Sequence, residues 1–480
     1  MVFLFLAWLM SIYFRHDEPS QNENRDPRQG TFLNRWFGVL VAVDSRSLGI
    51  FRIGLGCLLL FDLFRRIPDW GIWYSAHGLI PSTSEASLLR LSDDPVSSQL
   101  FIFTSIACYV AFTLGWRTRL FHLLSFVSVV SLHNRVTILE NGGDVVLGIV
   151  TGLSLLLPLG LTFSIDSVRQ KAAVPAPIRS IAVALLLFQL FVIYFLNGIQ
   201  KNGPSWRSGG ALELVLAQSR IVTTFGDWWL AHARASLPLL TYISIGIEIF
   251  APFLLLSPWH SSRCRLVGLV CLALLHIGIG LAVNVGLFSA AMIVFLTLFI
   301  PAEFWDRIFF SAHSVTDGPG TVYVRRPLVE ALSLVSGLAI VIQVSIQNPI
   351  LPEEIHMSHS PFTRAIIDIP RFYQGWMMFA PDAPREDGTQ ICRAITASGR
   401  AFDPLNRAAI GYEGPPFEML PRRLGYDQFW CDYFARIKQT SELHDPLRSW
   451  ISSSDGTQSF EVSWISGGEN QPSHAWMKSQ

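Results

Sequence analysis

The stretch YFLNGIQKNGPSW, residues 194–206, decides how the chain is interpreted, because it joins a hydrophobic run to a lysine. The run begins at Ile181 and contains no charged residue before Lys201. A helix of about 20 apolar residues crosses a bilayer, since in lipid a helix satisfies its own backbone hydrogen bonds. The stretch therefore predicts a transmembrane helix that ends at Lys201, with Gly198, Gly203 and Pro204 around the lysine.

Composition extends this prediction to most of the chain. Hydrophobic residues make up 50% of the 480 residues and charged residues only 15%, whereas a soluble domain has about 25% charged residues. The formal net charge is zero, so no overall field favours nucleic acid as a partner. The sequence predicts a polytopic membrane protein that is embedded in a lipid bilayer.

Nine apolar stretches are predicted to cross the membrane. They are residues 48–64, 99–114, 120–132, 145–161, 181–199, 237–256, 266–283, 287–300 and 327–345. The third and the eighth are short for a span. The predicted fold class is an all-α polytopic membrane bundle of about nine transmembrane helices with a C-terminal α+β extracytoplasmic domain.

The chain is predicted to divide into three regions. Residues 1–34 are a short apolar stub (2–14) and a disordered linker, residues 35–347 form the transmembrane domain, and residues 348–480 form a soluble α+β domain. In this last region, alternating polarity around 390–397 and 460–465 predicts strands. Ser398 and Gly399 predict a turn, and residues 426–438 predict a helix.

Positive charge predicts the orientation of the bundle. The loops on the membrane side that holds the N-terminus contain more Arg and Lys than the loops on the other side. Cytoplasmic loops carry such an excess. We therefore expect a multi-pass protein of the cell (inner) membrane with a cytoplasmic N-terminus and, after nine crossings, an extracytoplasmic C-terminal domain. Lys201, the Asn134–Arg135 pair and Asn284 then share the outer face.

Five ionisable residues interrupt the apolar stretches: Arg52, Asp144, Lys201, Glu248 and His276. Such a group costs about 3 kcal/mol at the centre of a span and is usually paired or functional. We expect Arg52 and Glu248 to neutralise each other, Asp144 to cap the fourth helix and His276 to hydrogen-bond another helix. Lys201 has two interpretations: it extends to the interface, or burial weakens its hold on the proton and it acts as a general base.

Signatures of soluble enzymes are absent from the sequence, which has no G-x-S-x-G, no H-E-x-x-H and no P-loop. The six cysteines include no C-x-x-C and no Cys/His cluster at zinc spacing, so no metal site is predicted. Cys392 and Cys431 could form a disulfide in an oxidising compartment, and the sequence leaves this open.

Six stretches together resemble the HTTM (horizontally transferred transmembrane) domain, the membrane core shared with vitamin K-dependent γ-carboxylase. Their order and spacing carry the resemblance, which covers roughly residues 46–388. They are FRIGLGCLLLFDLFRRIPDWGIWYSAHGLIP (51–81), LHNRVTILENGGD (132–144), PLGLTFSID (158–166), YFLNGIQKNGPSWRSGGAL (194–212), LHIGIGLAVNVGLFS (275–289) and FYQGWMMFAPDAPREDG (372–388).

The resemblance implies roles for individual residues. Lys201 keeps the register of the family lysine that deprotonates vitamin K hydroquinone, so it is the implied catalytic base. His276 falls on a second element implicated in catalysis, and a further catalytic histidine of the carboxylase falls on Gly143 here. The other candidates to line or support the site are Asn134, Arg135, Asp144, Tyr194, Trp206, Glu248, Asn284 and Ser289.

The implied function is quinol-dependent carboxylation of glutamyl side chains. Lys201 would take the phenolic proton of a reduced quinone, either vitamin K hydroquinone or menaquinol. Reaction with O₂ would then yield a base that removes a glutamate γ-proton, and the carbanion would capture CO₂. The implied partners are the quinone and an exported peptide or protein, with no metal. The alternative function is that of a non-catalytic HTTM-domain protein that binds or matures exported partners.

Overall fold

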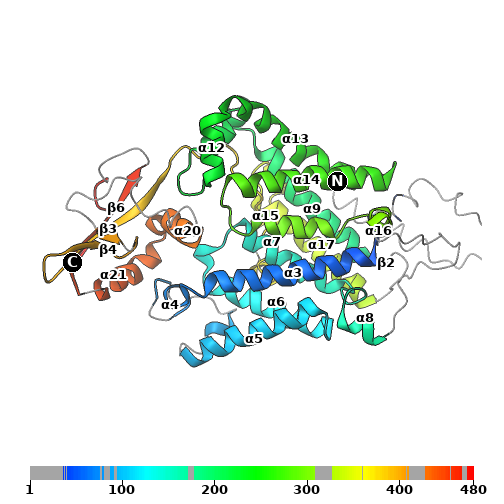
Figure 1. The fold of residues 1–480 in the computed structure, drawn as a ribbon, viewed down its shortest axis with the longest axis horizontal. Helices are drawn as coiled ribbons and strands as arrows, with labels where there is room; N and C mark the ends of the chain where they lie inside the picture. The colour runs from blue at the N-terminus through cyan, green and yellow to red at the C-terminus, as the bar shows by residue number, and fades with distance from the viewer. Residues whose placement is uncertain are drawn as a thin grey trace, which may run out of the picture.

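The computed structural model describes residues 36, 38, 40–75, 78–80, 87–90, 95–170, 178–308, 327–358, 360–406, 408–409, 428–454, 456–466 and 473–479. The apolar stub and the linker predicted for residues 1–34 lie outside the described residues. The described chain forms a bundle of helices with a small sheet and two helices at one end (Figure 1).

Six helices of the described chain are long and apolar enough to cross a membrane. They are α3 (Ser45–Arg66), α5 (Pro95–Leu114), α9 (Ile181–Gln200), α13 (Leu237–Leu255), α14 (Ser261–Ala282) and α17 (Pro327–Gln347). In Figure 1, α3, α5 and α14 run along the length of the bundle, and the C-terminal sheet lies beyond the end that contains α4 (Trp70–Trp73). These spans support the prediction of a multi-pass membrane protein.

The predicted number of nine spans is too high for the described residues. The third stretch lies in α6 (Thr118–Arg135), which is not apolar enough, and the fourth is the short helix α7 (Gly142–Leu153) with its 3₁₀ extension. The eighth is α15 (Phe288–Thr297), which is bent by 88° against α16 (Ala302–Ile308). Counting the bent pair as one span gives seven. The extracytoplasmic placement of the C-terminal domain stays a prediction.

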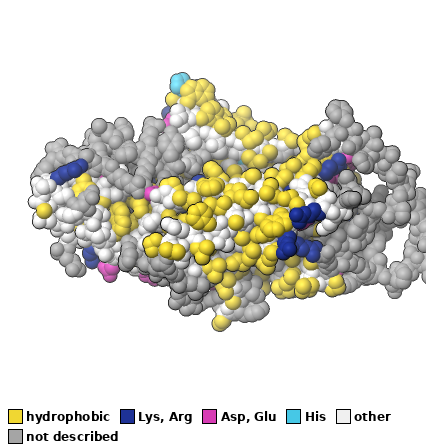
Figure 2. Space-filling view, turned by 60° about the horizontal axis from the view of Figure 1, so that its bottom comes forward, with side chains coloured by type: hydrophobic (Ala, Val, Ile, Leu, Met, Phe, Trp, Pro, Cys, Tyr) yellow, Lys and Arg dark blue, Asp and Glu magenta, His cyan; other side chains and the backbone are white. Residues whose placement is uncertain are grey.

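The bundle turns apolar side chains outward as well as inward. Figure 2 shows a broad hydrophobic surface across the middle of one face, with Lys and Arg gathered towards its margin. Exposed large apolar residues lie on helices throughout the bundle, among them Phe103, Leu123, Phe250, Leu274 and Val335. Apolar surface of this extent marks contact with lipid or protein. It fits a surrounding lipid bilayer.

Helix α9 is the most enclosed of the six spans. In its apolar window 78% of residues are buried, against 28% in α5, α13, α14 and α17. It packs against α13 on one side and α17 on another. Its start is fixed by Ser180, whose side chain accepts a hydrogen bond from the backbone N–H of Ala182. The candidate site therefore lies at the end of a helix that is surrounded by protein.

The C-terminal region contains the predicted sheet. It is a five-stranded antiparallel sheet in the order β5-β4-β3-β6-β7. The strands are β3 (Gly388–Thr396), β4 (Ala401–Asp403), β5 (Ala408–Ala409), β6 (Thr457–Ser466) and β7 (Met477–Lys478). The predictions of two strands and of a turn at Gly399, with a positive φ of 75°, are confirmed.

Helix α20 (Gln428–Arg436) joins this region to the bundle and is the helix predicted at 426–438. The Nε1 of Trp430 donates to Asp69 at 2.9 Å. The Cζ of Arg66 lies over the ring of Phe429, 4.7 Å from the centroid of that ring. Arg436 donates to two main-chain carbonyls in the segment before α7. The helix therefore covers the end of α3.

The cysteines form no disulfide. All six are free, including Cys392 in β3 and Cys431 in α20. The Sγ of Cys431 instead lies 3.2 Å from the carbonyl oxygen of Arg220. Cys392 and Cys431 therefore do not form the disulfide that the sequence left open.

Candidate functional site

The glycines around Lys201 explain how a lysine fits at the end of a hydrophobic helix. Helix α9 ends at Gln200, and Lys201 is its C-cap, with its N–H bonded to the carbonyl of Gly198. A Cβ on Gly198 would lie 2.8 Å from Ile249 and 3.1 Å from Glu248 of α13. The absent side chain lets α13 approach closely enough to place Glu248 beside the lysine.

Lys201 and Glu248 form a buried ion pair. The lysine Nζ lies 2.6 Å from each carboxylate oxygen, and the residues are only 9% and 5% exposed. The ring of Trp206 lies 4.8 Å from the Nζ, within the range of a cation–π contact. Lys201 therefore does not extend to the membrane surface, and we refer to these two residues as the Lys201–Glu248 pair.

The predicted pairing of Glu248 with Arg52 is wrong. The Arg52 guanidinium donates to main-chain carbonyls of Leu159 and Thr162, at 2.9 and 3.1 Å. The loop after α7 thus satisfies the hydrogen-bond donors of Arg52, since charged groups within membrane helices pair either with one another or with main-chain carbonyls. Glu248 is left to Lys201.

His276 of α14 hydrogen-bonds another helix, as expected. Its Nε2 lies 2.8 Å from the hydroxyl of Tyr194 on α9, and its ring contacts Phe288 of α15. The Nδ1 of His276 and the Oγ of Ser289 are buried and have no hydrogen-bond partner among the residues that the structure describes. Ser289 lies beside Gly280, one helical turn along α14 from His276. The His276 ring and the Lys201 ammonium are within Coulombic range of each other.

The segment 374–382 covers this end of the bundle. Its carbonyl groups at Trp376 and Phe379 accept hydrogen bonds from Gln200 and Trp206, each at 2.8 Å. These two donors flank Lys201 in the sequence. The chain that leads to the C-terminal region is therefore built into the wall around the lysine.

Asn197 connects this segment to the ion pair. Its Nδ2 donates to Glu248 at 3.1 Å, and its Oδ1 accepts from the N–H of Met378 at 2.8 Å. Asn197 lies one turn before Lys201 on α9. A movement of the segment 374–382 would therefore displace Asn197, which is a hydrogen-bond partner of Glu248.

Three predicted site residues lie away from the pair. Asn134 donates to the carbonyls of Val130 and Ile369. Arg135 is buried, and its guanidinium binds main-chain carbonyls of residues 74–80. Asn284 accepts from the N–H of Gly286 in the turn before α15. These bonds go to α6 itself and to neighbouring turns rather than to Lys201 or Glu248.

Asp144 belongs to the capping of α7, but Asn141 is the N-cap residue. The side chain of Asn141 accepts from the N–H groups of Gly143 and Asp144, and Asp144 accepts from the N–H of Asn141 in return. This is a capping box, with Asp144 at its third helical position. The prediction that Asp144 caps this helix is confirmed, but Asp144 acts from the third helical position and not from the N-cap position.

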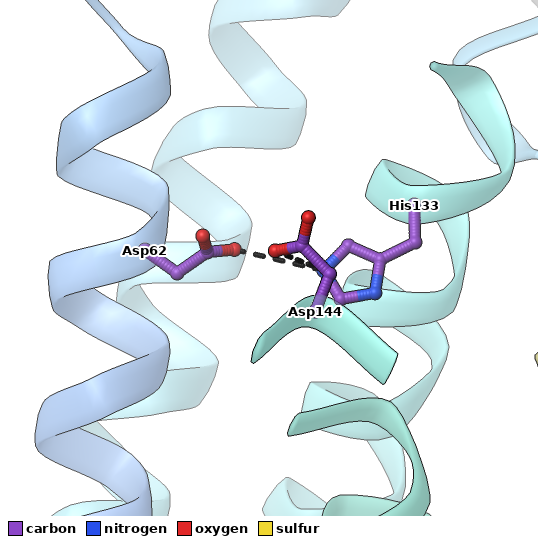
Figure 3. Close-up of side chains that lie close together, drawn as sticks. All are labelled: Asp62, His133 and Asp144. Carbon is purple, nitrogen blue, oxygen red and sulfur yellow. Dashed lines mark ion pairs between the residues drawn. The ribbon is translucent and has the colours of Figure 1, made fainter. Parts of the chain in front are cut away.

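Asp144 also takes part in a second buried ionic group that the sequence did not predict. Its Oδ1 accepts from Arg66 at 2.9 Å, and Arg66 binds both oxygens of Asp62, at 2.9 and 3.0 Å. His133 Nε2 lies 3.7 Å from Asp62 and 3.8 Å from Asp144. Figure 3 shows the side chains of Asp62, His133 and Asp144 pointing toward one another. We call Asp62, Arg66, His133 and Asp144 the Asp62 cluster.

One signal in the sequence could have found part of this cluster. Asp62 and Arg66 are four residues apart in an apolar helix, where ionisable groups are rare and usually paired. The contact of Arg66 with Asp144 joins residues 78 positions apart. No spacing rule connects α3, α6 and α7, so the assembly of the cluster depends on helix packing.

The N-terminus of α7 packs closely against the start of α15. A Cβ on Gly143 would lie 2.6 Å from the backbone nitrogen of Phe288. Residue 143 therefore has no room for the histidine that the family resemblance implies there. The ring of the same Phe288 contacts His276. Helix α7 therefore packs against a residue that is in contact with His276.

Asp432 approaches the Asp62 cluster from α20, outside the spans. Burial raises the pKa of the Asp432 carboxyl to about 7, and the neighbouring Arg436 and Arg220 partly offset this effect. Asp144 is within Coulombic range of the Asp432 side chain. The C-terminal region thus adds a titratable group next to the N-terminus of α7.

Comparison with protein families gives one match. The family model of the HTTM domain matches residues 41–305, more than half of the chain. The matched segment begins just before α3 and ends in α16, and it contains both ionic groups. No curated protein and no solved structure matches the chain.

Proposed function

Because the chain belongs to the HTTM domain family, we propose that it is a membrane enzyme resembling vitamin K-dependent γ-carboxylase. The proposed reaction is the quinol-dependent carboxylation of glutamyl side chains with O₂ and CO₂. The observation that carries the proposal is the buried Lys201–Glu248 pair, which lies at the position of the family lysine and beside the His276–Tyr194 hydrogen bond.

The pair can hold one proton in two places. With the proton on Lys201 it is an ammonium–carboxylate pair, and with the proton on Glu248 it is an amine and a carboxylic acid. Lys201 becomes a base for a phenol when Glu248 takes its proton. We therefore assign proton acceptance to the two residues together.

The surroundings of the pair fit a phenolic ligand in one respect. His276 Nδ1 and Ser289 Oγ are buried polar atoms without a partner among the described residues, and such atoms lose free energy unless a ligand or water satisfies them. They would hold the oxygen atoms of a reduced quinone. When bound, the quinone supplies the electrons for O₂ chemistry, which no side chain provides.

Access from lipid supports a lipid-soluble quinone as the reductant. Helices α13 and α14 carry Glu248 and His276 on their inner faces, where both are buried. Their outer faces expose large apolar residues such as Tyr242, Phe253 and Leu281. We propose that the quinone enters from the bilayer beside these helices. The exported peptide would reach Lys201 from the aqueous side, which we propose to be extracytoplasmic.

A second candidate function is that of a non-catalytic HTTM-domain protein that binds or matures exported partners. The close contact of Gly143 with the backbone of Phe288 favours it, because the implied catalytic histidine is missing and has no space. The complete neutralisation of Lys201 by Glu248 is also compatible with a purely structural ion pair.

Turnover measurements distinguish the two candidates. The purified full chain in lipid nanodiscs is given menaquinol, O₂, radiolabelled bicarbonate and a glutamate-rich peptide. We expect quinol consumption and label incorporation by the wild type and by the exposed-site control Lys438→Met. Lys201→Met should reduce quinol consumption by about 10²-fold or more, as expected for loss of a general base. Absence of both turnover and quinol binding in the wild type would favour the non-catalytic candidate.

A further inference from the structure

The Asp62 cluster contains an unsatisfied imidazole nitrogen that faces two carboxylates. His133 is 3% exposed, and its Nε2 has no hydrogen-bond partner in the described part of the chain. Asp62 and Asp144 are each 1% exposed. In Figure 3 the imidazole points into the space between the two carboxylates. A buried polar atom without a hydrogen-bond partner is often explained by a bound water molecule or ion.

The distances are those of metal ligands rather than of hydrogen-bonded groups. His133 Nε2 lies 3.7 Å from Asp62 Oδ2 and 3.8 Å from Asp144 Oδ1, and the three ligand atoms all lie within 4.8 Å of one another. Direct hydrogen bonds would be about 2.9 Å long. Ligand atoms about 2.0–2.2 Å from a tetrahedral ion are about 3.4 Å apart, so the two distances from His133 are close to that spacing, and metal binding would draw the three ligand atoms together.

Arg66 leaves the required oxygen positions available. It donates to both oxygens of Asp62 and to the Oδ1 of Asp144, while Asp144 Oδ2 accepts from Asn141. A carboxylate oxygen has two acceptor positions, so the two oxygens that face His133 can each still bind one more group. Hydrogen bonds to ligating carboxylates are a common feature of the outer shell of metal sites.

The charges around the cluster also permit a cation. Asp62 and Asp144 are two buried negative groups, and Arg66 is the buried cation that contacts both. Arg65 reaches Asp62 at 3.4 Å from a partly exposed position. Asp432, within Coulombic range of Asp144, adds a further acidic group. Asp62 and Asp144 outnumber Arg66, so these three residues together carry one negative charge, which favours a bound cation.

We propose that Asp62, His133 and Asp144 bind a divalent first-row metal ion, such as Zn²⁺, Mn²⁺ or Fe²⁺. One imidazole with two carboxylates is a donor set that suits these ions. The ligands come from α3, α6 and the N-terminus of α7, so the ion cross-links three helices. This site is separate from the Lys201–Glu248 pair and stabilises α7, whose first turn packs on Phe288.

Metal content and metal titration test the proposal without an activity assay. The full chain is purified with a histidine-free tag, stripped with a chelator, and titrated with Zn²⁺ and with Mn²⁺. We expect about one equivalent per chain by elemental analysis, and a rise in the thermal midpoint on adding the ion. In His133→Gln the affinity should fall more than about tenfold, as for loss of a metal-site contact.

His122→Gln is the matched control. His122 lies on the same helix and is buried, and its Nε2 is already bonded to the carbonyl of Thr151 at 3.0 Å. This control should keep the metal even if its stability falls. The proposal is overturned if the wild type retains neither ion and its thermal midpoint does not respond, or if His133→Gln binds as tightly as His122→Gln.

Discussion

The two buried ionic groups of the bundle differ in how their charges are matched. In the Lys201–Glu248 pair, one cation meets one anion, and both carboxylate oxygens contact the same nitrogen. In the Asp62 cluster, Arg66 bridges two carboxylates, and the nearby His133 Nε2 has no hydrogen-bond partner within the described ranges. A two-member pair can move a proton without rearrangement, whereas a four-member cluster that joins three helices is suited to holding structure.

Both groups are closed by the C-terminal part of the chain, but by different elements. The segment 374–382 covers the Lys201–Glu248 pair, and α20 covers the Asp62 cluster through Phe429. The comparison leads to four substitutions that should separate a structural cluster from a proton-handling pair. They are ordered by the size of the expected effect.

Removal of the bridging cation should have the largest effect. Arg66→Met leaves Asp62 and Asp144 buried without their shared partner, which we expect to destabilise the protein by about 5 kcal/mol or more. Arg65→Met is the control, because Arg65 is partly exposed and its contact with Asp62 is longer, at 3.4 Å. The control should cost less than about 1 kcal/mol.

The amount of monodisperse protein and its unfolding in detergent mixtures measure both arginine variants. Equal stability of Arg66→Met and Arg65→Met would show that the Asp62 cluster does not hold the helices together.

Breaking the Lys201–Glu248 pair on one side should have the next largest effect. Glu248→Gln leaves Lys201 buried without its counter-ion, at an expected cost of about 3–5 kcal/mol. In the double variant Lys201→Met/Glu248→Leu both charges are gone, and replacement of a buried pair by apolar residues is often neutral or stabilising by about 1–4 kcal/mol. Unfolding of the three proteins under one set of conditions measures this. A double variant less stable than Glu248→Gln would contradict the expected pairing.

Gly143→Ala tests the packing between the two groups. The new Cβ would lie 2.6 Å from the nitrogen of Phe288, a main-chain atom that cannot simply rotate away. We expect a loss of about 1–3 kcal/mol, as for other overpacked sites. Gly246→Ala in α13 is the control, since nothing lies within 4 Å of its Cβ position. If both alanines are tolerated equally, α7 does not rest on α15 as described.

Asp432 gives the smallest effect and a dependence on pH. Burial raises the pKa of its carboxyl from the ordinary value of 3.8 to about 7, so between these values the folded protein binds more protons than the unfolded one. Its contribution is fully present below pH 3.8 and is lost as the pH rises through about 7. The slope is at most about 1.4 kcal/mol per pH unit.

Hydrogen exchange in α20, corrected for the intrinsic effect of pH, measures this slope. We expect Asp432→Asn to flatten it between about pH 5 and pH 7. Burial also raises the pKa of the Asp403 carboxyl to about 6, and this group is present in both proteins, so it cancels in the comparison. Identical slopes in the two proteins would exclude Asp432 as the titrating group.

The sequence predicts what depends on local pattern and fails where packing decides. The long apolar helices and the strands around Gly399 follow from composition and periodicity. The span count was too high because α6 carries too many polar residues for a membrane span and α7 is only 12 residues long. The partners of Glu248 and Asp144 could not be predicted, since Gly198 and Gly143 fix which helices approach and a sequence does not show that approach.

Quinol consumption by Lys201→Met/Glu248→Leu tests most directly whether the Lys201–Glu248 pair handles the proton. This variant removes the proton-exchanging groups without leaving a buried charge unpaired, so loss of activity cannot be attributed to unfolding. We predict wild-type stability together with quinol consumption at least about 10²-fold lower. A folded double variant that consumes quinol at the wild-type rate would contradict the proposed role of the pair.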